Sequence, residues 1–153
     1  MGLLKLGMEN MALTEWFLKR IKERFATYEI SNFGNYHSKH NLGYWEHKDY
    51  IGLGSGAVGF LKNERFYPNS NVQAYIDNPL DIQSEPLSEE AVKTEKIFLG
   101  LRSVVGVDET ILSEKEQEKA RLLVKEKKLN YRDGCFYNDD YLLSDELALF
   151  IQQ

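Results

Sequence analysis

The stretch SEKEQEKARLLVKEKKLNYRDGCFY, which runs from Ser113 to Tyr137, decides the fold class. Its first four residues form a capping box, in which Ser113 and Glu116 satisfy each other's backbone N–H groups at the start of a helix. We expect that helix to extend to about Lys128. Asp133-Gly134 then separates two short runs with aromatic residues, which predicts a small hairpin. A helix followed by a hairpin predicts a mixed, α+β fold.

Helices are predicted on both sides of this stretch. Ser88 can cap a helix whose first turn carries Glu89 and Glu90, which suit the positive end of the helix dipole. The apolar stripe of that helix is Ile97, Phe98, Leu101, Val104 and Val105. Ser144-Asp-Glu is expected to cap a short terminal helix that ends near Ile151. The order helix, helix, hairpin, helix over residues 87–153 predicts a winged-helix-like C-terminal helical domain.

The residues before this domain have a different pattern. Apolar residues at spacings of three and four predict an amphipathic helix from about Asn10 to Phe25. Residues 27–33 are rich in strand formers, and a polar, aromatic loop follows them to Tyr50. Residues 50–61 are expected to be a glycine-rich strand. Residues 62–86 carry turn signals and are expected to be a connecting arm, so the predicted domains are 1–61, 62–86 and 87–153.

The bulk composition argues against several classes of protein. The chain has 153 residues, a net charge of −5 and a pI of about 5.3, so it lacks the basic surplus of a typical nucleic-acid binder. No apolar run approaches the roughly 20 residues of a membrane-spanning helix. The apolar residues 1–8 are too short for a secretory signal, and the single cysteine, Cys135, fits a reducing compartment. We therefore expect a cytoplasmic protein without a membrane span or a nucleic-acid partner.

Four blocks of sequence carry a resemblance to a known family. They are Tyr28-Glu-Ile-Ser-Asn-Phe33, His40-Asn-Leu-Gly-Tyr-Trp45, Asp49-Tyr-Ile-Gly-Leu-Gly-Ser-Gly-Ala57, and Glu95-Lys-Ile-Phe-Leu-Gly-Leu-Arg102 followed by Gly106-Val-Asp108. In this order and spacing, the chain resembles the C-terminal part of the HemW-type branch of the radical-SAM family, which is related to oxygen-independent coproporphyrinogen III oxidase. The resemblance runs from the first predicted helix to the end of the chain.

The resemblance implies a partial (β/α) barrel that holds a 4Fe–4S cluster on a Cys-x3-Cys-x2-Cys motif, and a cluster that cleaves S-adenosylmethionine. Residues 10–61 would be the last helix and strands of that barrel, and residues 87–153 the family's C-terminal domain. One cysteine cannot supply three thiolates, so we expect no catalytic residue in this chain. We expect it to act as a fragment of a longer chain or beside a separate radical-SAM half. Strand edges left unpaired by missing barrel neighbours would also favour either a homo-oligomer or instability.

The motif His40-Asn-x-x-Tyr-Trp45 is the first candidate site. In the HemW-type branch, as the resemblance implies, it is tied to heme binding and distinguishes heme chaperones from oxidases. An imidazole can be an axial ligand of heme iron, and tyrosine and tryptophan offer flat apolar faces to a porphyrin. The candidate heme-binding residues are His40, as the iron ligand, with Asn41, Tyr44 and Trp45. In the alternative, Tyr44 and Trp45 pack against the barrel end while His40 and Asn41 hydrogen-bond the loop backbone.

The glycine-rich segment is the second candidate site. By resemblance, Gly54, Ser55, Gly56 and Ala57 line the cavity on the S-adenosylmethionine and substrate side; alternatively, the glycines permit a close approach of two backbones. The segment fits the G-x-G-x-x-G pattern, but no helix start follows it, so we reject a dinucleotide-binding fold. Val58 stands where relatives commonly carry histidine, and this departure puts the substrate-side contacts in doubt.

Several functions stay open at this point. The favoured one is the C-terminal part of a HemW-like heme chaperone, with heme or another porphyrin as its ligand. The alternative is the C-terminal part of an oxygen-independent coproporphyrinogen III oxidase. A winged-helix DNA binder built on residues 87–153 is disfavoured by the glutamates of its expected recognition helix. A zinc site on His37, His40 and His47 is disfavoured as well, because structural zinc usually has four ligands, often thiolates, at tighter spacing.

Overall fold

Residues 1–37 and 38–153 form two separate units in the computed structural model, which describes residue 13 and residues 16–153. In the first unit, residues 16–22 are helical, within the helix expected from Asn10 to Phe25, and the earlier part of that prediction falls largely outside the described residues. The strand formers at 27–33 make an isolated antiparallel bridge between Thr27 and Phe33, and no strand is described there. The described residues of the first unit therefore form a helical stretch followed by turns and one isolated bridge.

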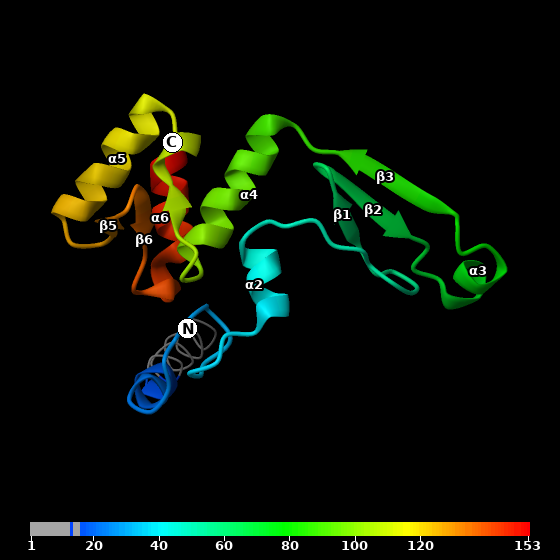
Figure 1. The fold of residues 1–153 in the computed structure, drawn as a ribbon, viewed down its shortest axis with the longest axis horizontal. Helices are drawn as coiled ribbons and strands as arrows, with labels where there is room; N and C mark the ends of the chain where they lie inside the picture. Colours follow the sequence, from blue (N-terminus) through cyan, green and yellow to red (C-terminus); the bar gives the residue numbers. More distant parts are fainter. Residues whose placement is uncertain (1–12, 14–15) are drawn as a thin grey trace, which may run out of the picture. The chain divides into compact units, whose positions relative to one another are not determined.

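The C-terminal part of the second unit is a helical subdomain with its own small sheet (Figure 1). Its elements are α4 (Glu89–Leu101), β4 (Val107–Asp108), the 3-10 turn η1 (Glu109–Ile111), α5 (Glu114–Lys125), β5 (Asn130–Arg132), β6 (Cys135–Tyr137), the 3-10 turn η2 (Tyr141–Leu143) and α6 (Ser144–Gln152). All three helices, the caps at Ser88 and Ser113, and the hairpin were expected from the sequence.

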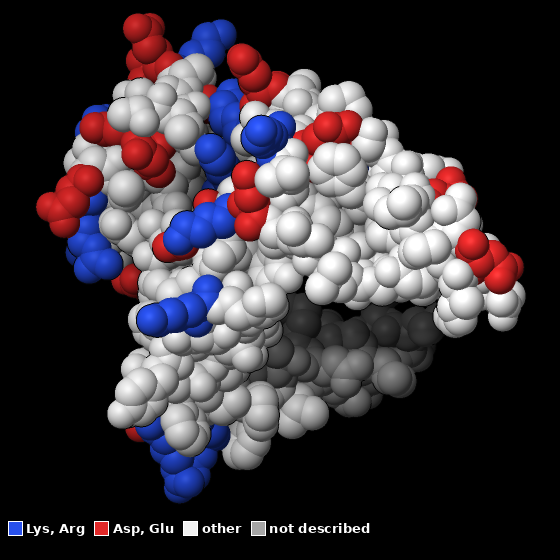
Figure 2. Space-filling model, turned by 45° about the vertical axis from the view of Figure 1, so that its right-hand side comes forward, with Lys and Arg blue, Asp and Glu red and all other residues white. Residues whose placement is uncertain are grey.

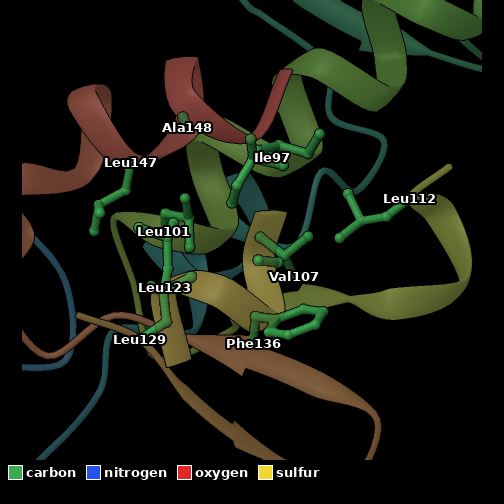
Figure 3. Packing of buried hydrophobic residues seen from close by; sticks show 11 residues of the cluster. Ile97, Leu101, Val107, Leu112, Leu123, Leu129, Phe136, Leu147 and Ala148 are labelled. Carbon is green, nitrogen blue, oxygen red and sulfur yellow. The ribbon is translucent and has the colours of Figure 1, made fainter. Parts of the chain in front are cut away.

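The core of this subdomain lies where α4, α5, α6 and the sheet meet. Figure 3 shows the side chains of Ile97 and Leu101 from α4 pointing towards those of the neighbouring elements. The cluster of buried residues comprises Ile97, Leu101, Val107, Leu112, Ala120, Leu123, Leu129, Phe136, Leu147, Ala148 and Ile151. Because burying apolar surface contributes about 25 cal/mol per Å², the packing of this cluster stabilises the subdomain. Val104 and Val105, expected in the helical stripe, follow the end of α4 and are only half-buried.

The small sheet has the strand order β4-β6-β5, with both pairs antiparallel. The turn of its hairpin is made by Asp133 and Gly134, whose φ angles are 51° and 80°. Two successive positive φ angles define the type I′ turn that connects two-residue hairpins. The pair was read correctly from the sequence because this turn type accepts few residues other than Asn, Asp and Gly.

The capping box of α5 also binds α4. The Ser113 backbone N–H donates to Glu116 Oε2 at 2.7 Å, and the Glu116 N–H donates to Ser113 Oγ at 3.4 Å. The Lys93 ammonium of α4 lies 3.0 Å from Glu116 Oε1. Burial alone would raise the pKa of Glu116, but these donors outweigh it, so its pKa is lowered. The Glu116 carboxylate thus caps the N-terminus of α5 and also links α5 to α4 through Lys93.

The substitution Glu116→Gln should lower the free energy of unfolding at neutral pH by about 1–2 kcal/mol, the range for a cap and a charged hydrogen bond. Because the folded-state pKa is depressed, the carboxylate stabilises the protein above its unfolded pKa of about 4.3, and this contribution is lost as the pH falls through the folded pKa. Urea unfolding from pH 7 down to pH 3 tests this. Glu114→Gln, at an exposed position of the same turn, is the control. A gap between wild type and Glu116→Gln that persists at pH 3 would contradict the assignment.

Ser144 does not cap α6 in the expected way. It is the first residue of the helix, and the capping position is Leu143, which makes no side-chain cap. The Ser144 hydroxyl is buried and lies 2.6 Å from the Tyr141 carbonyl oxygen and 3.0 Å from that of Leu101. The expectation was wrong because the turn η2 leads directly into α6. The Ser144 hydroxyl instead links the start of α6 to the end of α4 through the Leu101 carbonyl oxygen.

The N-terminal part of the second unit is a three-stranded antiparallel sheet with two short helices. Its elements are α2 (Lys39–Trp45), β1 (Gly59–Leu61), β2 (Glu64–Pro68), α3 (Val72–Asp77) and β3 (Ile82–Pro86), with the strand order β1-β2-β3. Residues 39–45 form a helix where a loop was expected, and only the last three residues of the expected strand at 50–61 are in β1. Residues 62–86, expected as an arm, contain two strands and α3. The protein is therefore of the mixed α+β class, as predicted.

The two parts of the second unit differ in the chemistry of their surfaces. On the face shown in Figure 2, Lys, Arg, Asp and Glu are interspersed over the helical subdomain, whereas few of them appear over the part with the β1-β2-β3 sheet. Large apolar side chains are exposed there, among them Ile51, Leu53, Val72, Ile76 and Leu80. Among the described residues, no helix has the length and apolar content needed to cross a bilayer.

Candidate functional site

Helix α2 presents the candidate heme-binding motif. Ser38 caps it, because the Asn41 backbone N–H donates to Ser38 Oγ at 3.3 Å. His40 and Tyr44, four residues apart, share one face of the helix, and their rings meet edge to face with centroids 4.9 Å apart. Tyr44 in turn contacts Tyr50 edge to face at 4.6 Å. His40 and Tyr44 of α2 therefore form a continuous aromatic row with Tyr50, which follows the helix in the chain.

The members of the motif differ in exposure. His40 is exposed, and 38% of Tyr44 remains accessible, whereas Asn41 and Trp45 are half-buried. An exposed imidazole can present a ring nitrogen to a ligand. The structure thus places His40 and Tyr44 at the surface and leaves Asn41 and Trp45 partly accessible.

A cavity of about 260 Å³ lies next to Tyr44, between α2, the first two strands and α4. Its walls are Tyr44, His47, Lys48, Tyr50, Phe60, Arg65, Glu95, Phe98, Leu99 and Arg102. Four of these residues are aromatic and three are cationic. A hollow with aromatic walls and a few charged groups is the usual form of a small-molecule site.

Glu95 is the central polar group of this cavity. Its Oε2 lies 2.8 Å from His47 Nε2, and its Oε1 accepts a hydrogen bond from the Arg65 guanidinium. The His47 side chain is only 5% exposed, and its ring packs edge to face on Phe60 with centroids 4.5 Å apart. His47 has a φ of 55° and follows Glu46, the C-cap of α2, where a left-handed residue commonly ends a helix. Glu95 therefore connects the end of α2 to α4 and to β2.

The surroundings shift two pKa values in this cavity. Burial raises the pKa of the Tyr50 phenol, against the opposing charge of Arg65. Burial would lower the pKa of Arg65, but the charge of Glu95 outweighs it, so the pKa is raised. At neutral pH the cavity therefore holds a neutral phenol and a charged guanidinium.

Arg102 stands at the end of α4, where it is the C-cap residue. Its guanidinium carbon lies 5.4 Å from the centre of the Phe98 ring, within the range of a cation–π contact. The exposed carboxylate of Asp145 accepts from Arg102 Nη2 at 2.6 Å and from Nε at 3.0 Å. Lys48 pairs with Glu46 at the surface. The cavity thus has two cations whose partners lie outside it.

Comparisons with known proteins identify relatives of this sequence. No family model matches the chain, and no solved structure matches it. The chain is 38% identical over 114 residues to the heme chaperone HemW of Lactococcus lactis, a match that covers 69% of this chain and 30% of that protein. It is 40% identical over 96 residues to the heme chaperone HemW of Bacillus subtilis, with 58% and 25% covered. The chain is related to the C-terminal region of HemW proteins.

A shorter match points the same way. The mitochondrial radical S-adenosyl methionine domain-containing protein 1 of Danio rerio is 47% identical over 49 residues, which cover 31% of this chain and 10% of that protein. The chain thus spans less than a third of the length of each of these three relatives.

The glycine-rich segment lies apart from the cavity beside α2. Gly56 lines a different hollow, beside β2 and β3, and Ala57 lines a third, beside β1. Ser55 Oγ lies 3.0 Å from the Asn69 carbonyl oxygen and 2.9 Å from that of Ser70. Gly54 has a φ of 116°. These four residues therefore shape a loop beside β2, and the structure does not bring them together with the HemW-like motif on α2.

Close backbone approach explains one glycine of this region. A Cβ at Gly52 would lie 2.2 Å from the Ala57 carbonyl oxygen, a distance that no side chain can adopt. Val58, the departure from the HemW-type pattern, is half-buried. The chain folds back on itself at this point, which requires glycine whatever the segment binds.

The three histidines of the sequence contact three different residues and do not form one cluster. His37 stacks on Tyr28 at 4.5 Å in the first unit, His40 contacts Tyr44, and His47 contacts Glu95. Over residues 13 and 16–153, no three His, Cys, Asp or Glu side chains are grouped closely enough to hold a metal ion.

Sequence reasoning did not identify the Glu95 cluster as a site. Glu95 and Arg102 stand at the two ends of a block quoted for its HemW resemblance, and their spacing of seven places them on one face of a helix. Phe98 and Leu99, three and four residues after Glu95, lie on the same face and complete the cavity wall. That spacing was a usable signal. The contacts with His47 and Arg65 were not predictable, because they span 48 and 30 residues.

Proposed function

We propose that this chain contributes to heme binding as the C-terminal part of a HemW-like heme chaperone, and that it is not catalytic alone. The observation that carries the proposal is the exposed His40 imidazole, edge to face with Tyr44 beside a cavity with aromatic walls. The relatives named heme chaperones support it, and they favour it over the coproporphyrinogen oxidase alternative.

The residues present fit a porphyrin with iron. Heme is the cargo in this proposal, and His40 would supply the axial nitrogen. Tyr44 and Trp45 would offer aromatic faces to the macrocycle, and Asn41 would hold the first turn of α2 through its capped backbone N–H. Each role needs α2 to be folded, so Ser38 supports the site indirectly.

The residues present do not fit an iron–sulfur cluster. Clusters of this kind are held by three or four thiolates, and the 153 residues contain one cysteine, Cys135, half-buried in β6. In the proposal, radical chemistry of S-adenosylmethionine therefore belongs to a radical-SAM portion outside these 153 residues, either in a longer chain or in a separate partner, and the part played by this chain is to bind the tetrapyrrole.

Replacing His40 with alanine should weaken the binding of ferric heme by about tenfold or more, equivalent to about 1.4 kcal/mol, because an axial ligand is lost. The measurement is a titration of the full chain, followed by the shift of the heme Soret band. His37→Ala is the matched control, since His37 is also exposed and lies outside α2. Equal binding by wild type, His40→Ala and His37→Ala would remove His40 from the ligand role.

A further inference from the structure

The cavity beside α2 carries more positive than negative charge. The charged groups on its walls are Lys48, Arg65, Arg102 and one carboxylate, Glu95, with His47 as a further titratable group. Glu95 already accepts from His47 and Arg65. Arg102 and Lys48 pair with the carboxylates of Asp145 and Glu46, neither of which lines the cavity. The cavity is therefore suited to an additional carboxylate.

Arg102 is the cation best placed to accept such a carboxylate. The side chain of its partner, Asp145, is 62% exposed, and ion pairs of exposed side chains contribute little to stability. A ligand carboxylate could replace Asp145 at small cost. The contact with the Phe98 ring fixes the position of the guanidinium, and a positioned guanidinium can bind a carboxylate through two parallel hydrogen bonds.

The walls and the volume define the rest of the ligand. Tyr44, Tyr50, Phe60 and Phe98 suit a flat apolar body. At about 260 Å³ the cavity is smaller than the roughly 300–1,000 Å³ of sites that enclose a whole drug-sized ligand. It therefore fits the edge of a large flat molecule whose remainder lies outside. Tyr44 belongs both to this cavity and to the aromatic row of His40, so one molecule can contact both.

We propose that this cavity binds the propionate-bearing edge of the tetrapyrrole, with Arg102 as the partner of a propionate carboxylate. This inference rests on the proposed heme-binding function and adds a second anchor to it. His40 recognises the iron, and Arg102 recognises a carboxylate. The two anchors respond to different parts of the ligand, so they can be tested separately.

Metal-free protoporphyrin separates the two anchors, because it keeps both propionates and has no iron. The full chain is titrated and porphyrin fluorescence is followed. Arg102→Gln should weaken binding by about tenfold, the loss expected for a charged hydrogen bond, while His40→Ala should weaken it far less than it weakens the binding of ferric heme. Arg121→Gln is the matched control, because Arg121 also lies over a ring, that of Tyr131 at 5.2 Å, and also pairs with a carboxylate, that of Glu109, away from the cavity.

Asp145→Asn supplies a test in the opposite direction. It removes the anion that competes for Arg102 at an exposed position, so it should tighten the binding of metal-free protoporphyrin. This variant keeps the proposal falsifiable if Arg102→Gln fails to fold. The dimethyl ester of protoporphyrin, which has no free carboxylate, should bind wild type about as weakly as the free acid binds Arg102→Gln.

The outcomes separate this inference from the heme proposal. If heme binding depends on His40, but the free acid and the ester bind equally and Asp145→Asn changes nothing, the propionate anchor is wrong and the iron ligand stands. If His40→Ala binds heme like wild type while Arg102→Gln loses the free acid, the ligand role of His40 fails and the anchor stands. If wild type binds neither heme nor protoporphyrin, both are overturned.

Discussion

Replacing Leu101 with alanine is expected to lower the free energy of unfolding by about 2–5 kcal/mol. Leu101 is fully buried, at the last position of α4, in the cluster that joins α4, α6 and the small sheet. Alanine there removes apolar contacts and leaves a cavity that the surrounding helices cannot easily close. Equilibrium unfolding in urea, followed by far-UV circular dichroism, measures the loss.

The control for this substitution is Leu149→Ala on α6. Leu149 is 53% exposed, so its truncation changes the same atoms in a helix without opening a cavity. We expect its effect to stay within about 0.5 kcal/mol, as for most surface substitutions. Equal losses for the two variants would show that Leu101 is not a core residue.

The second large effect is expected for Gly100→Ala. A Cβ at this position would lie 2.2 Å from the Gly106 carbonyl oxygen and 2.9 Å from Val107 Cγ2. Because a backbone carbonyl cannot move aside as a flexible side chain can, α4 must shift away from β4. Overpacking of this kind costs about 1–3 kcal/mol and occasionally more. Thermal unfolding of the full chain should show a clear fall in Tm.

Gly43→Ala is the matched control for this prediction. Gly43 is also helical, in α2, but a Cβ there would meet nothing within 4 Å. Alanine is favoured over glycine in a helix by about 1 kcal/mol, so this variant should be as stable as wild type or slightly more stable. A fall in Tm of the same size in both variants would mean that contact with Gly106 is not the cause.

The helical subdomain was predictable from the sequence because its boundaries depend on local chemistry. Ser88 and Ser113 act as caps through their own side chains, and Asp133-Gly134 sets its turn through backbone conformation alone. None of these features needs a distant partner. The end of α5 was placed three residues too far, at Lys128, because charged residues continue past Lys125 without a stop signal.

Strands β2 and β3 were not predicted, because they lack the usual alternation of buried and exposed residues. The residues of β3 are all exposed, and those of β2 are all half-buried, so no buried face marks either strand. Helix α2 was expected to be a loop because seven residues with an internal glycine give little helical periodicity. Sequence patterns do not reveal strands and helices whose residues are only slightly buried.

The candidate site was predictable only in part. A local motif singled out His40 and Tyr44 together, but their common helical face was not predicted, because the segment was expected to be a loop. The cavity beside it is assembled by contacts between residues far apart in the chain, such as Glu95 with Arg65. Such contacts leave no trace in local composition, so Arg102 could be assigned to the cavity only once α4 had been placed against α2.

Helix α4 leaves little freedom for sequence change. One face carries Ile97 and Leu101 into the core, and another carries Glu95 and Phe98 into the cavity wall. From residue 91 to residue 101, Lys96 is the only exposed position. Substitutions accepted by the protein should therefore gather at Lys96 and in the first turn. At the other positions of α4, the side chains pack against either the core or the cavity wall, so a substitution there disturbs a packed contact.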